Sequence, residues 1–153
     1  MGSKKIMTLC IIHQGNKILL GMKKRGFGKG RYNGFGGKVH DGESVEEAAK
    51  RELIEEAGIR CKELDLIGVL EFSWTNKPEI LEVHIFKAEK IEGEPTESEE
   101  MKPEWFHIDE IPFHSMWSDD PHWFPLFLEN KKFKGNFVFD DSDKMVQYNL
   151  EEI

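Results

Sequence analysis

A chain of 153 residues with 39% hydrophobic and 11% aromatic residues is long enough to fold as one domain around a hydrophobic core, which disfavours disorder. Its 21 Lys and Arg against 29 Asp and Glu give a net charge of −8, so long nucleic acid is a poor partner, because its binding depends on phosphate neutralisation. No apolar stretch approaches the roughly 20 residues of a membrane helix, and we expect no membrane partner.

The predicted elements indicate an α+β domain with a mixed sheet. In chain order they are a strand hairpin, a glycine-punctuated loop, a helix, a second hairpin, an acidic loop, a short strand, a second helix and a last hairpin. Their ranges are 6–12 with 17–22, 21–38, 43–59, 66–74 with 80–88, 89–103, 104–108, 120–130, and 133–139 with 144–150. No linker divides them, so a single domain is predicted over residues 1–153.

Local signals mark the ends of both helices. Ser44 and Glu47 have the spacing of a capping box, and Gly58 is typical of a left-handed helix stop. Asp120 before Pro121 predicts the N-cap and first turn of the second helix.

The two cysteines, Cys10 and Cys61, are too few for a disulfide framework and lack zinc-type spacing. We therefore expect a reduced, cytoplasmic protein, with mitochondrial or nuclear fractions left open. An acidic chain without an evident apolar interface stripe is expected to be a monomer. The six histidines show no metal or nucleophile spacing.

The sign of the charge reverses sharply after the basic loop, since seven acids fall within residues 41–59. Glu52, Glu55 and Glu56 are spaced to share one helical face, where they repel unless a cation lies among them. Carboxylates are ligands that Mg²⁺ uses together with substrate phosphates. Taken alone, the three glutamates are equally typical of a solvated acidic face.

The longer spacing resembles the signature of the Nudix hydrolases, with all nine specified positions present: Gly37, Glu43, Arg51, Glu52, Leu53, Glu55, Glu56, Gly58 and Ile59. The resemblance implies a Nudix fold, an α/β/α sandwich around a mixed sheet with a loop–helix–loop metal site. It also implies Mg²⁺-dependent hydrolysis of a nucleoside diphosphate linked to another group, with Mn²⁺ able to substitute.

Carried onto this chain, the resemblance assigns the metal ligands to Gly36 through its carbonyl, Glu52, Glu55, Glu56 and Glu100. Glu43 and Arg51 are implied supports of the loop and helix, and Arg51 joins the four glutamates in the catalytic set. Glu56 and Glu100 both remain candidates for the general base.

Three further stretches, 21–39, 97–106 and 111–125, resemble the animal MutT-homologue branch of this family. That branch cleaves oxidised purine nucleoside triphosphates to the monophosphate and pyrophosphate. The implied substrate-binding set is Thr8, Lys23, Phe27, Asn33, Gly37, Lys38, Phe72, Leu81, Met101, Trp117, Asp119, Asp120 and Trp123.

Asp119 and Asp120 are the sharpest members of this set. Two close carboxylates ionise unequally, so one can donate a hydrogen bond to a base edge while the other accepts one. As an isolated pattern the pair also fits a helix cap. Likewise, Asn33 alone fits a turn, and any one aromatic alone fits the core.

Trp74 and Leu81 stand where Phe and Met are expected in the nearest relatives. The preference among 8-oxo-dGTP, 2-oxo-dATP and O6-methyl-dGTP therefore stays open. The alternatives are another Nudix activity on a different nucleoside diphosphate derivative, and a nucleotide-binding module without turnover.

Overall fold

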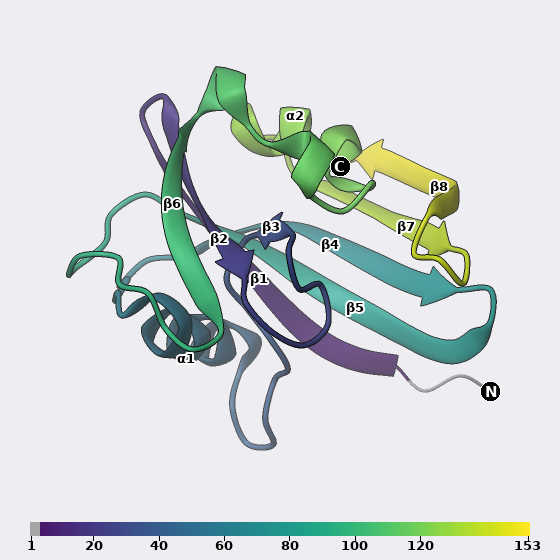
Figure 1. Cartoon of the computed structure of the whole chain (residues 1–153), viewed down its shortest axis with the longest axis horizontal. Coiled ribbons are helices and arrows are strands. Elements are labelled where there is room, and N and C mark those ends of the chain that lie inside the picture. Colours follow the sequence, from purple (N-terminus) through teal and green to yellow (C-terminus); the bar gives the residue numbers. More distant parts are fainter. Residues whose placement is uncertain (1–3) are drawn as a thin grey trace.

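The computed structural model describes residues 4–153, and its centre is one mixed eight-stranded sheet (Figure 1). The strand order is β3-β2-β1-β5-β4-β7-β8, and β6 pairs with β2 off this path. The strands are β1 (Lys4–Gln14), β2 (Lys17–Lys23), β3 (Tyr32–Asn33), β4 (Asp65–Trp74), β5 (Lys77–Ala88), β6 (Met101–His107), β7 (Phe133–Phe139) and β8 (Met145–Glu152).

Two α-helices, α1 (Val45–Ala57) and α2 (Asp120–Leu128), cover opposite faces of this sheet (Figure 1). Neighbouring residues of a strand point to opposite faces. On β1, Cys10 accordingly packs in the core under α1, whereas Ile11 packs in the core under α2. This layering, with β1–β5 and β4–β7 parallel and the other pairs antiparallel, confirms the predicted α+β sandwich around a mixed sheet.

Helix α1 forms as its end signals predict. The Ser44 side chain accepts a hydrogen bond from the Glu47 amide, and the Glu47 carboxylate accepts one from the Ser44 amide, which completes the capping box. Gly58 ends the helix in the left-handed region with φ of 68°, where a side chain would be strained. The helix is shorter than the predicted 43–59 because its caps lie just inside that range.

The second helix corrects the predicted cap. Asp120 is its first helical residue rather than its N-cap, and Asp119, which precedes it, makes no capping hydrogen bond. Instead, the Asp119 carboxylate accepts a hydrogen bond from the Trp123 indole at 2.8 Å.

Several strands also differ from prediction: β1, β5 and β8 extend beyond the ranges 6–12, 80–88 and 144–150. Strand β6 begins at Met101, inside the predicted acidic loop, because all seven of its residues pair with β2. The two-residue strand β3 within the glycine-rich loop was not predicted. The single-domain prediction included residues 1–3, which lie outside the described residues.

Candidate active site

A cavity of about 290 Å³ opens where the glycine-rich loop, β1, β4, β5 and the start of α2 meet. Every predicted substrate-binding residue except Lys38 lines it, and so do Gly36 and Glu56 from the predicted metal set. Several lining residues were not predicted from the sequence: Met7, Leu9, Gly28, Arg31, Gly34, Val83 and Phe139. Phe139 could have been found by pairing β7 with β4, since its register partner is Trp74, but that pairing is long-range.

Aromatic rings form one side of the cavity. The ring centroid of Trp117 lies 5.0 Å from that of Phe27 and 5.7 Å from that of Phe139. The Arg31 guanidinium lies 4.1 Å from the centre of the Trp117 ring, a cation–π distance. Flat, π-rich walls of this kind suit a planar heterocyclic ring.

The Asp119–Asp120 pair is almost completely buried at the edge of this cavity, with 3% and 2% of its two residues exposed. Burial raises the pKa of Asp119, and burial together with the charge of Asp119 raises the pKa of Asp120 well above 3.8. Among the described residues, Oδ2 of Asp120 has no hydrogen-bond partner. With one carboxyl protonated and the other ionised, such a pair would offer a donor and an acceptor to a ligand in the cavity.

Glu56, on α1, also lines this cavity. Only 6% of the residue is exposed, and its carboxylate accepts a hydrogen bond from the Gly36 amide at 2.9 Å. Burial, followed by the charges of Glu52 and Glu100, raises its pKa to about 8. A buried carboxyl beside two others is stabilised in its ionised form when a cation joins them.

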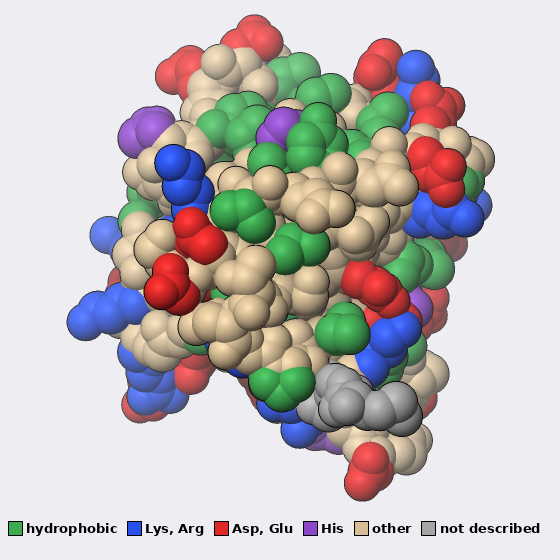
Figure 2. Space-filling model, turned by 90° about the vertical axis from the view of Figure 1, so that its right-hand side faces the viewer, with side chains coloured by type: hydrophobic (Ala, Val, Ile, Leu, Met, Phe, Trp, Pro, Cys, Tyr) green, Lys and Arg blue, Asp and Glu red, His purple; other side chains and the backbone are tan. Residues whose placement is uncertain are grey.

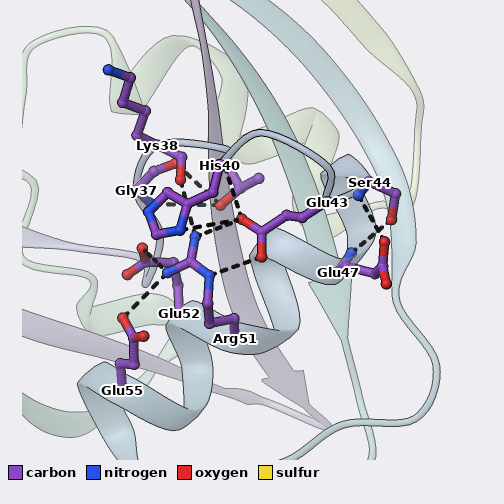
Figure 3. Close-up of polar contacts among 10 residues, drawn as sticks. Gly37, Lys38, His40, Glu43, Ser44, Glu47, Arg51, Glu52 and Glu55 are labelled. Carbon is purple, nitrogen blue, oxygen red and sulfur yellow. Dashed lines mark hydrogen bonds and ion pairs between the residues drawn. The ribbon is translucent and has the colours of Figure 1, made fainter.

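Arg51 organises the outer part of the acidic helix face (Figure 3). Its guanidinium donates to Glu43 at 2.9 and 2.8 Å, to Glu52 at 2.8 Å and to Glu55 at 3.2 Å. A further bond, of 3.0 Å, reaches the Lys38 carbonyl in the loop. Arg51 holds the pKa of Glu43 down to about 2. This one cation therefore offsets the repulsion predicted for the helix and ties it to the loop.

Neither Lys38 nor Glu100 lines the cavity. The Lys38 side chain extends away from the Arg51 cluster (Figure 3). The Glu100 carboxylate accepts hydrogen bonds from Lys23 at 2.8 Å and Arg25 at 3.0 Å, which lower its pKa. These ion pairs thus connect the basic loop to the acidic loop.

Within residues 4–153, no three His, Cys, Asp or Glu side chains are grouped as a ready-made metal site. The carboxylates are instead engaged by Arg51, by the Gly36 amide and by Lys23 and Arg25. The oxygen-only donors around the buried Glu56 nevertheless fit a hard divalent cation. A β-carbon on Gly37 would approach Oε1 of Glu52 to 2.7 Å, so glycine is what allows the loop to lie against this carboxylate.

Comparisons with known proteins agree with this geometry. A model of the NUDIX domain matches residues 4–127. The chain is 51% identical to the oxidized purine nucleoside triphosphate hydrolases of Mus musculus and Danio rerio, over all of this chain and 98% of each relative. Among solved structures, the mMutator MutT protein of Bacillus halodurans superposes with a TM-score of 0.86 at 30% identity, covering 96% of this chain and 97% of that one.

Proposed function

Since the chain belongs to the Nudix family, we propose that it hydrolyses oxidised or otherwise modified purine nucleoside triphosphates, releasing the nucleoside monophosphate and pyrophosphate. The observation that carries the proposal is the buried Asp119–Asp120 pair at the edge of an aromatic cavity that Glu56 also lines. One end of the cavity fits a purine, and the other lies beside the acidic helix that fits a metal. Removing such triphosphates would keep damaged purines out of newly made DNA.

Different residues of the cavity would contact the face and the polar edge of the base. The Trp117 ring offers a face for the base, while Asp119 and Asp120 meet its polar edge with one acceptor and one donor. In Asn33, the side-chain oxygen accepts a hydrogen bond from the Gly34 amide, which leaves its NH₂ group for the ligand. A change of protonation in the carboxylate pair would let it match either a guanine-type or an adenine-type edge.

The metal site would be formed by Glu52, Glu55, Glu56 and the Gly36 carbonyl, joined by Glu100 once its ion pairs open. We propose Mg²⁺ as the resident ion, with Mn²⁺ as a substitute. When bound, the ion lowers the pKa of water and neutralises charge on phosphate oxygens.

The chain's own groups supply positioning and proton transfer. Lys23 lines the cavity and can meet a phosphate oxygen when it leaves Glu100. Of the two candidate bases, Glu56 is buried and lines the cavity, whereas the Glu100 carboxylate is engaged by Lys23 and Arg25. We therefore favour Glu56 as the group that takes the proton from water. The water oxygen then bonds to phosphorus, and the bridging P–O bond breaks.

We further propose a monomer that resides in the cytoplasm and acts on small molecules, without nucleic-acid or membrane partners. No helix among residues 4–153 is both long and apolar enough to cross a membrane.

The test is Mg²⁺-dependent turnover of 8-oxo-dGTP against dGTP, with the products separated by chromatography. We expect kcat/KM to favour 8-oxo-dGTP by at least about tenfold, with pyrophosphate as the second product. Asp119→Asn should reduce that preference, because it removes the ionisable acceptor. Equal rates on both substrates would refute the base-pocket argument, and cleavage of dinucleotide polyphosphates alone would indicate another Nudix activity.

A further inference from the structure

We propose that Asp143, in the turn between β7 and β8, is a positioning residue that fixes the Trp74 indole as one wall of the base cavity. Oδ1 of Asp143 accepts a hydrogen bond of 2.8 Å from Nε1 of Trp74, which lies 69 residues earlier in the chain. Trp74 lines the cavity and Asp143 does not. The inference rests on the proposed function, because it concerns recognition in the same cavity.

Trp74 is well placed to shape the cavity. It is the last residue of β4, it is 6% exposed, and it lies opposite Phe139 in the β4–β7 register. Its ring centroid is 5.6 Å from that of Phe139 and 6.0 Å from that of Phe27. The Lys77 ammonium, across the β4–β5 turn, lies 4.5 Å from the centre of the ring. Turning this indole would therefore disturb several neighbours of the ligand.

The β7–β8 turn does not need the Asp143 side chain for its own shape. Oδ1 of Asp140 accepts hydrogen bonds from the Ser142 amide and hydroxyl and from the Lys144 amide, at 2.9, 2.8 and 3.0 Å. The Asp140 amide also donates to the Lys144 carbonyl at 2.8 Å. With the turn closed by Asp140, the carboxylate of Asp143 is free to bind the indole.

The backbone of Asp143 supports this division of roles. Its φ of 61° lies in the left-handed region, which Asp and Asn tolerate better than other residues with side chains. The Thr75 amide donates to the Phe139 carbonyl at 2.9 Å, which ties the end of β4 to the end of β7. The turn is thereby held where its carboxylate reaches the only polar atom of the Trp74 side chain.

The effect on a ligand passes through Phe27. Phe27 is 59% exposed, on a loop where Gly26 and Gly28 have φ of 75° and 85°, and its ring contacts both Trp74 and Trp117. Figure 2 shows hydrophobic side chains gathered across the upper and middle parts of the face that carries the β4–β5 and β7–β8 turns, with most charged side chains toward its edges. A Trp74 ring held in one orientation gives the Phe27 ring a fixed packing partner when the base binds.

The experiment compares Asp143→Gly with Asp143→Asn in the full chain. Both substitutions accept the left-handed backbone, but only Asn keeps an oxygen that can accept the indole hydrogen bond. Asp141→Asn, an exposed position of the same turn, is the matched control. Kinetics on 8-oxo-dGTP give KM and kcat, and ¹⁵N-correlated NMR reports the indole N–H of each tryptophan, with Trp74→Phe identifying the Trp74 signal.

We expect Asp143→Gly to raise KM by about five- to tenfold with kcat changed by about twofold or less, because a hydrogen bond that orients the wall is lost. Asp143→Asn should recover most of the wild-type KM, and Asp141→Asn should match wild type. The Trp74 indole signal should move in Asp143→Gly and in neither of the other two variants by a comparable amount.

An unchanged KM in Asp143→Gly would overturn the proposal, as would equal losses of kcat in the Gly and Asn variants, which would indicate a purely structural role for the turn. If the wild-type protein does not turn over 8-oxo-dGTP, the proposed function fails, and the NMR measurement still decides the positioning: an unmoved Trp74 signal in Asp143→Gly overturns it.

Discussion

Replacing Asp120 by Asn should remove one proton from the pH dependence of folding. The unfolded carboxyl titrates near 3.8, whereas burial and the charge of Asp119 raise the pKa of the folded carboxyl well above that value. Between these two pH values the native state holds a proton that the unfolded state has released. Wild-type stability therefore falls as pH rises through this window, and the Asn variant lacks this contribution.

The slope follows from proton linkage, because one excess proton changes the free energy of unfolding by ~1.4 kcal/mol per pH unit. Across the interval between the two pKa values, the difference between Asp120→Asn and wild type should therefore grow by up to that amount for each pH unit. Glu56 also has a raised pKa, but it is present in both proteins and cancels in the difference.

Urea unfolding at several pH values, with a chelator present, measures this difference directly. Asp141→Asn, which removes an exposed carboxylate, serves as the control and should give a curve parallel to wild type. If Asp120→Asn and wild type also give parallel curves at every pH tested above 3.8, Asp120 keeps no extra proton in the folded state, and the donor–acceptor account of the base edge is refuted.

Three further predictions concern the acidic helix. Glu56→Gln should lower kcat by roughly 10²- to 10³-fold while nucleotide affinity and circular dichroism stay unchanged, since Gln can still accept from the Gly36 amide; normal turnover would remove Glu56 from the mechanism. Because the pKa of Glu56 is about 8, Mg²⁺ binding should release up to about one proton near neutral pH and far less at pH well above 8. Calorimetry in buffers of different ionisation enthalpy measures this proton release. A release that does not vary with pH would contradict the prediction. Arg51→Lys should lower the free energy of unfolding by about 1–3 kcal/mol in urea, because Lys cannot bridge Glu43 and Glu52 together; unchanged stability would show that the Arg51 contacts contribute little.

Helix α1 was predictable because its determinants are local. The capping box at Ser44 and Glu47 and the stop at Gly58 lie within a few residues of the helix ends, and helical spacing alone puts Glu52, Glu55 and Glu56 on one face. The sequence could not rank these three carboxylates. Glu56 is buried with a raised pKa and the Glu52 side chain is only 13% exposed, whereas the Glu55 side chain is 57% exposed, because the loop carrying Gly36 and Gly37 lies against the first two only.

The N-cap predicted at Asp120 was wrong because the position of this side chain depends on distant parts of the chain. A carboxylate before Pro121 fits a cap in any isolated peptide, but here Asp119 binds Trp123 and both carboxyls are buried at the cavity edge. The resemblance to related sequences predicts that the pair binds the base, which stays a prediction, whereas the residue pattern alone fits a cap. Burial against distant elements is a property of the packed chain, and no local spacing encodes it.

The amino-acid sequence by itself determined the class of fold, the acidic helix and most of the residues that line the cavity, because spacing, caps and family motifs are written along the chain. Only the tertiary structure decided which charges face each other. Glu100 is paired with Lys23, Arg31 lies over Trp117, and Asp143 reaches Trp74 from the β7–β8 turn. These contacts join segments that are distant in sequence, and their geometry is set by strand register and packing rather than by local preference.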